Sequence, residues 1–120
     1  FFLCGGTARA IGRGELLEPL PTQPAWFAIA WPGFELSTAA VYARWDEIGG
    51  QGANHLTAAA LLADERLAAF QEELGEGWQM TGSGSSFFAA AGTPAEAELR
   101  RRAAPHNVWT AIAQAVPRWC

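Results

Sequence analysis

The chain has 120 residues, enough for one domain with a modest hydrophobic core. Half of the residues are hydrophobic, so we expect a globular chain rather than a disordered one. The net charge is −4, and all 8 basic residues are arginine. Nucleic-acid binders usually carry a basic stripe, whereas the basic cluster here, Arg100 to Arg102, falls at the end of a predicted helix. Cations at that position oppose the helix dipole, so we predict no nucleic-acid partner.

We expect neither a signal peptide nor a membrane helix from this sequence. No apolar run approaches the roughly 18 residues that a membrane helix needs, and the start lacks the charged region of a signal peptide. Two cysteines, Cys4 and Cys120, do not make a disulfide framework and are typical of a reduced, cytoplasmic protein. The strand-like opening Phe1-Phe2-Leu3 has no initiator methionine and indicates a fragment of a longer protein.

The first part of the chain predicts short strands. After a strand over Phe1–Leu3, we expect a hairpin with strands over 7–11 and 15–20, joined by the turn Gly12-Arg13-Gly14. The apolar run Trp26–Trp31, ended by Pro32-Gly33, is typical of a central buried strand.

Helices are predicted next, each from its capping residue. Ser37-Thr38 precedes an alanine-rich helix, Asn54 is expected to cap a helix through about Leu62, and Asp64 another through about Leu74. In the last of these, Leu67, Phe70 and Leu74 share one face, and Gly75 is the expected C-cap.

Two short strands, over 78–81 and 86–91, precede the last helix and the last strand. Thr93-Pro94-Ala95-Glu96 combines a threonine cap, a first-turn proline and a glutamate, which predicts a helix to about Arg102. A final strand is expected over 108–113. From Trp26 onward, this order is that of an α+β, ferredoxin-like split β-α-β sandwich, with four antiparallel strands and helices on one face.

Between the two short strands lies the segment Met80-Thr81-Gly82-Ser83-Gly84-Ser85-Ser86-Phe87-Phe88. Its amides and hydroxyls are groups that bind phosphate. A Walker A loop is excluded because the chain has no lysine, and a dinucleotide fingerprint because its third glycine is missing. A hairpin turn alone is the alternative; the run of five small residues favours a loop whose amides face a ligand.

Three separated segments carry a family resemblance. They are Gly5-Gly6-Thr7-Ala8 with Gly12-Arg13-Gly14-Glu15-Leu16 and Pro19-Leu20; Pro32-Gly33 with Ser37-Thr38-Ala39 and Val41-Tyr42; and Thr81–Ser86 with Phe88. In this order they resemble the C-terminal half of 4-diphosphocytidyl-2-C-methyl-D-erythritol kinases, of the GHMP kinase superfamily. The resemblance implies an ATP- and magnesium-dependent kinase that phosphorylates a cytidyl sugar alcohol in the non-mevalonate isoprenoid pathway.

The same resemblance implies how domains and catalytic residues are distributed along the full-length kinase. Residues 1–22 would be the tail of the N-terminal kinase domain, and 23–120 the GHMP kinase C-terminal domain. The catalytic aspartate and lysine would lie before Phe1, in a missing N-terminal domain that would be this chain's partner. The chain alone would then hold no catalytic residue and no metal site, bind no ATP or magnesium by itself, and be inactive.

Candidate site residues follow by motif. The resemblance assigns Gly82, Ser83, Gly84 and Ser85 to nucleotide binding, and Arg13, Thr38 and Tyr42 to the substrate, with Tyr42 stacking on cytosine. Two of the substrate residues have a plain structural alternative: Tyr42 would otherwise be a core aromatic, and Thr38 a helix cap. In the turn that contains Arg13, Glu15 would simply pair with Arg13 or Arg9.

One segment departs from the family. Asn54-His55-Leu56-Thr57 stands where relatives have an N-D-L-E-like sequence, so two acids are absent. His55 and His106 are isolated and are expected at the surface.

Two other functions remain open: another GHMP kinase, acting on mevalonate, homoserine or galactose, or a stand-alone ferredoxin-like binding domain.

Overall fold

The computed structural model describes residues 5–117. The predictions for Phe1–Leu3, Cys4 and Cys120 therefore lie outside the described residues. The elements in chain order are β1 (Thr7–Ile11), β2 (Leu16–Leu20), β3 (Trp26–Trp31), α1 (Thr38–Ile48), α2 (Thr57–Ala63), α3 (Glu65–Leu74), β4 (Gln79–Met80), β5 (Phe87–Ala91), α4 (Pro94–Ala103) and β6 (Trp109–Gln114).

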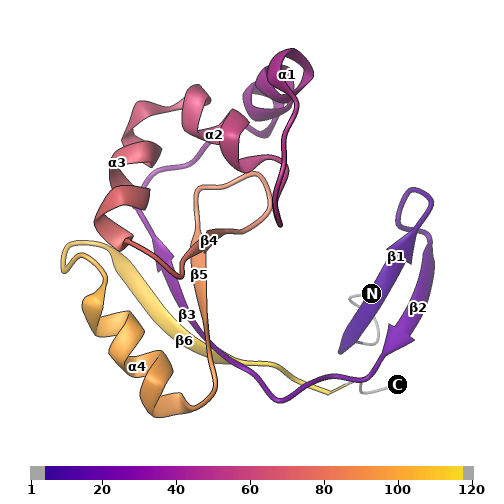
Figure 1. Cartoon of the computed structure of the whole chain (residues 1–120), viewed down its shortest axis with the longest axis vertical. Coiled ribbons are helices and arrows are strands. Elements are labelled where there is room, and N and C mark those ends of the chain that lie inside the picture. The colour runs from indigo at the N-terminus through magenta and orange to yellow at the C-terminus, as the bar shows by residue number, and fades with distance from the viewer. Residues whose placement is uncertain (1–4, 118–120) are drawn as a thin grey trace.

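The strands form two antiparallel sheets (Figure 1). β1 and β2 make an isolated hairpin, and the other four strands are ordered β4-β5-β3-β6. β3 pairs with β5 on one side, Ala30 opposite Phe87, and with β6 on the other, Trp31 opposite Trp109. The predicted α+β class and the central position of Trp26–Trp31 are confirmed.

Most helix boundaries are set by local capping, as predicted. Ser37 accepts a hydrogen bond from the Ala40 amide, Asp64 from the Arg66 amide, and Thr93 from the Glu96 amide. Gly75 ends α3 at φ 76°, a backbone conformation that glycine adopts without strain.

The α2 prediction is wrong at its start. Leu56, not Asn54, is the N-cap, and no side chain caps it. The Asn54 carboxamide instead accepts a hydrogen bond from the Leu56 amide, two residues along, and its NH₂ group donates elsewhere. Asparagine favours local turns and helix caps alike, so the sequence pattern does not separate the two.

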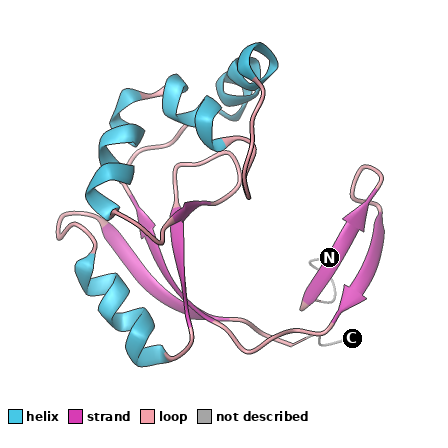
Figure 2. Cartoon of the chain, in the orientation of Figure 1, coloured by secondary structure: helices cyan, strands magenta, loops and turns pink. Residues whose placement is uncertain are grey.

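One face of the four-stranded sheet is buried under the helices (Figure 2). Its side chains are those at alternate positions of β3 and β5: Ala28, Ala30, Phe87, Ala89 and Ala91. The small alanines let α4 lie close to the strands. Phe87 is fully buried and packs edge-on against Phe70 of α3, with ring centroids 5.7 Å apart. Leu67, Phe70 and Leu74 face this core, as predicted.

The opposite face of the sheet, here called the open face, carries Phe27, Ile29, Trp31, Phe88 and Trp109. The rings of Phe27 and Phe88 meet edge-on at 6.0 Å. Trp31 and Trp109, opposite each other in register, remain 37% and 58% exposed. An apolar sheet face of this kind is typical of a surface that another element or protein covers.

Within residues 5–117, no helix has the length and apolar character needed to cross a bilayer.

The two phenylalanines at the start of β5 provide a test of this packing. Phe87→Ala should lower the free energy of unfolding by about 3–5 kcal/mol, because it opens a cavity between the sheet and α3. The matched variant Phe88→Ala, on the partly exposed open face, should cost clearly less. Urea unfolding followed by circular dichroism measures both; equal losses would contradict the assignment of the two faces.

Candidate functional site

The segment Thr81–Ser86, here called the glycine loop, connects β4 to β5. Its ends are held as in a hairpin, because the Thr81 amide donates to the Ser86 carbonyl at 2.9 Å. The Gly84 amide donates to the Thr81 carbonyl at 3.1 Å and forms the turn itself. Hairpin and ligand loop are therefore compatible descriptions of this segment.

Glycine is required at two points of the loop. Gly82 and Gly84 have φ angles of 56° and 87°, which L-residues rarely adopt. At Gly84 a Cβ atom would also lie 2.8 Å from Leu36 Cδ1 and 3.1 Å from Met80 Sδ. Among the described residues, the amides of Gly82, Ser83 and Ser85 have no hydrogen-bond acceptor. The loop thus combines a tightly packed backbone with amide groups, those of Gly82 and Ser83, that are available to an anion.

The loop lies beside the start of α1. The Thr38 Oγ1 and Ser83 Oγ atoms are 3.1 Å apart and share a hydrogen bond. Ser37 is the residue that caps the helix, so the alternative in which Thr38 serves only as a cap is wrong. A predicted substrate residue and a predicted nucleotide residue are thereby in direct contact.

Tyr42 lies one turn further along α1, four residues after Thr38, so the two side chains are neighbours on the helix surface. Its side chain is 49% exposed, which contradicts the alternative of a core aromatic. The tyrosine ring is therefore accessible to a ligand on the same side of α1 as the Thr38 hydroxyl.

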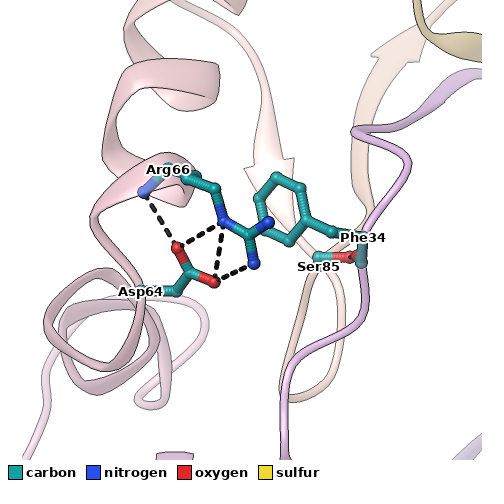
Figure 3. Close-up of polar contacts among 4 residues, drawn as sticks. All are labelled: Phe34, Asp64, Arg66 and Ser85. Carbon is teal, nitrogen blue, oxygen red and sulfur yellow. Dashed lines mark hydrogen bonds and ion pairs between the residues drawn. The ribbon is translucent and has the colours of Figure 1, made fainter.

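A chain of contacts joins the glycine loop to α3 (Figure 3). The buried Ser85 hydroxyl donates to the Phe34 carbonyl. Arg66 lies over the Phe34 ring, with its Cζ atom 4.1 Å from the centroid, a cation–π contact. The guanidinium also pairs with Asp64, Nη2 to Oδ2 at 2.6 Å. Its hydrogen bonds lower the pKa of the Asp64 carboxyl below the usual value, and the pKa of Arg66 is raised in return.

Arg13 is not brought to this cluster. It lies at the tip of the β1–β2 hairpin, which Figure 1 shows well apart from α1 and the glycine loop. There the Glu15 carboxylate accepts a hydrogen bond from the Arg13 amide at 2.5 Å. Glu15 thus holds the turn through the backbone, and the described residues contain no ion pair between Glu15 and Arg13 or Arg9.

Asn54 also contacts the glycine loop, a role that the sequence did not predict. Its NH₂ group donates to the Met80 carbonyl at 2.9 Å and to the Gly82 carbonyl at 2.8 Å. A cleft of about 510 Å³ lies alongside, lined by 53–56, 79–82 and Phe88. No local signal in the sequence connects positions 26 and 28 residues apart.

The remaining polar residues lie apart from the loop. His55 and His106 are exposed, as predicted. The arginine cluster stands in the last turn of α4, where Arg101 and Arg102 both pair with Glu98. Among the described residues, no three His, Cys, Asp or Glu side chains lie close enough together to hold a metal ion.

The relatives and the solved structure described next carry the same enzyme name. The chain matches no protein-family model. It is 32% identical to the 4-diphosphocytidyl-2-C-methyl-D-erythritol kinase of Novosphingobium aromaticivorans over 89% of the chain and 45% of that kinase. It is likewise 32% identical to the kinase of the same name from Chromobacterium violaceum, over 72% of the chain and 37% of that kinase.

A solved structure agrees in fold. A crystal structure of 4-(cytidine 5'-diphospho)-2C-methyl-D-erythritol kinase superimposes with a TM-score of 0.64 at 24% identity, covering 91% of this chain and 50% of that one. The chain is thus homologous to these kinases. It spans less than half the length of the curated relatives above.

The two glycines of the loop give a matched test of its packing. Gly82→Ala should cost about 1 kcal/mol of stability, because it strains the backbone in open space. Gly84→Ala should cost roughly 2–4 kcal/mol, because it adds a clash with Leu36 and Met80 to the same strain. Urea unfolding of both variants decides between them, and equal costs would contradict the close packing at Gly84.

Proposed function

We infer that this chain is the C-terminal part of a 4-diphosphocytidyl-2-C-methyl-D-erythritol kinase, an ATP-dependent enzyme of the non-mevalonate isoprenoid pathway. Homology over 89% of the chain supports the family. The contact between Thr38 and Ser83, at 3.1 Å, is the main support for the proposed site, because it joins the expected substrate segment to the expected nucleotide loop. No match favours another GHMP kinase or a stand-alone binding domain.

We propose the domain division of residues 1–22 and 23–120. The strand order β4-β5-β3-β6, with helices between β3 and β4 and between β5 and β6, supports a ferredoxin-like split β-α-β domain from residue 23 onward. The β1–β2 hairpin stands apart from that domain (Figure 1) and exposes Leu16, Leu17 and Leu20. In the proposed kinase this apolar surface belongs to the N-terminal domain.

On the nucleotide side, the glycine loop would contribute amide dipoles to the ATP phosphates. Phosphoryl transfer depends mainly on positioning and on stabilising charge, and fixed amides supply both. The amides of Gly82 and Ser83, which are at least partly exposed and have no acceptor among the described residues, fit a phosphate group. We assign no magnesium ligand and no catalytic base to the described residues; in the proposal both belong to the N-terminal domain, together with the active-site lysine.

On the substrate side, Tyr42 would stack on the cytosine ring while the Thr38 hydroxyl contacts the base or ribose. The exposed ring of Tyr42, one turn from Thr38, supports this arrangement. Arg13 would contact a phosphate of the substrate from the wall contributed by residues 1–22. The complete enzyme, which consumes ATP, would act in the cytoplasm.

A chimeric kinase tests the proposed function. The 120 residues replace the part of the Novosphingobium aromaticivorans kinase that they match, which is 45% of that relative. The chimera should phosphorylate the cytidyl substrate in the presence of ATP, whereas the chain alone should not. A folded chimera that phosphorylates homoserine, mevalonate or galactose instead, or turnover by the chain alone, would overturn the proposal.

The same chimera tests Tyr42. Loss of a stacked base costs ~1–3 kcal/mol in nucleic-acid binders, so Tyr42→Ala should raise KM for the cytidyl substrate roughly 5- to 150-fold with little change in KM for ATP. Tyr42→Phe keeps the ring and serves as the control, with KM close to that of the parent. An unchanged KM in Tyr42→Ala would refute the stacking role.

A further inference from the structure

We propose that Asn54 is a positioning residue that holds the glycine loop in the conformation that binds phosphate. Its effect on the loop follows from contacts in this chain, and its effect on catalysis rests on the proposed kinase function. Asn54 would touch neither substrate; it acts through the backbone of Met80 and Gly82.

The Asn54 carboxamide is fully engaged. Both carbonyls, of Met80 and Gly82, accept from Nδ2, at 2.9 and 2.8 Å, and Oδ1 accepts from the Leu56 amide at 3.0 Å. The opposite orientation of the carboxamide would place its oxygen against two carbonyls and its NH₂ against an N–H group. The network therefore defines both the orientation of Asn54 and its role as a donor.

The position of Met80 and Gly82 at the sheet edge explains why a side chain reaches their carbonyls. Met80 is the last residue of β4, and Gly82 lies in the turn that follows, at φ 56°. β4 comprises only Gln79–Met80 and pairs with β5 on its other side, so this edge has no neighbouring strand in the order β4-β5-β3-β6. At this edge, the Asn54 side chain supplies the donors that a neighbouring strand would supply. They bind the carbonyl of Met80, the last residue of β4, and that of Gly82, the second residue of the loop.

The loop needs such support because its residues resist ordering. Two glycines at positive φ lose more conformational freedom on folding than other residues do. Contacts hold the middle and the far end of the loop, Ser83 to Thr38 and Ser85 to Phe34. Asn54 holds the near end, so the amides of Gly82 and Ser83 lie between two fixed points. The hydrogen bonds of Asn54, here called the clamp, use only its side chain, so they require no acid at positions 55 and 57.

Asn54→Asp tests the clamp with almost no change in shape. The aspartate keeps the acceptor for Leu56 but loses both donors and places a carboxylate oxygen against the two carbonyls. Asn107→Asp makes the same substitution at an exposed position and is the matched control.

The first readout is amide hydrogen exchange of the 120-residue chain by NMR. Asn54→Asp should speed exchange at the Thr81 and Gly84 amides by roughly tenfold or more, because the two hydrogen bonds from Asn54 to the Met80 and Gly82 carbonyls are lost. The Ala97 amide of α4 should keep its rate, as should all three in Asn107→Asp. Unchanged exchange at Thr81 and Gly84 would overturn the proposal. If Asn54→Asp unfolds the chain, Asn54→Ala, which removes the donors without adding a charge, gives the same comparison.

The second readout is the kinetics of the chimera. Asn54→Asp should raise KM for ATP or lower kcat about tenfold and leave KM for the cytidyl substrate within about twofold. A looser loop with unchanged ATP kinetics would overturn the catalytic role of the clamp. If the parent chimera folds but is inactive, the proposed function fails, whereas the exchange measurement still decides whether Asn54 holds the loop.

Discussion

The antiparallel pairing of β3 with β5 is the constraint from which the candidate site follows. Ala30 lies opposite Phe87, so the chain leaving β3 and the chain entering β5 start from the same end of the sheet. The segment after Trp31 contains Phe34 and Thr38, and the segment before Phe87 is the glycine loop. Their contacts, Phe34 with Ser85 and Thr38 with Ser83, bridge 51 and 45 residues of sequence because the register brings their ends together.

The sheet separates two kinds of apolar residue. Along β3, alanines on the helix-covered face alternate with large side chains on the open face. β5 places Phe87, Ala89 and Ala91 on the helix-covered face and Phe88 on the open face. Phe70 and Phe87 fill the space between α3 and the strands. Within residues 5–117, helices and strands thus form a core on one face of the sheet. On the other face, Trp31 and Trp109 stay partly exposed among the described residues.

Local order was predictable from the sequence because capping and periodicity act over a few residues. Ser37, Asp64 and Thr93 identify their helices by a hydrogen bond to an amide two or three positions away. The prediction that Asn54 caps α2 is wrong for the same reason, because its local turn resembles a cap in sequence. Its main partners lie across the sheet edge. For Arg13, Thr38 and Tyr42, only the family resemblance indicates a role at the substrate. The contact of Thr38 with Ser83 and the distant position of Arg13 required three-dimensional pairing that no local pattern encodes.

The hydroxyl pair of Thr38 and Ser83 has a consequence for the way two ligands would communicate. Either oxygen can be the donor, but the hydrogen bond between them uses only one proton. If a phosphate accepts a hydrogen bond from the Ser83 hydroxyl, the hydrogen bond between the two side chains must be donated by Thr38. The Thr38 oxygen can then act only as an acceptor towards other groups. Thr38 then favours a donor, such as an amino or hydroxyl group, on its other side. Binding on one side thereby selects the hydrogen-bonding character of the other, and thermodynamic linkage makes the effect reciprocal.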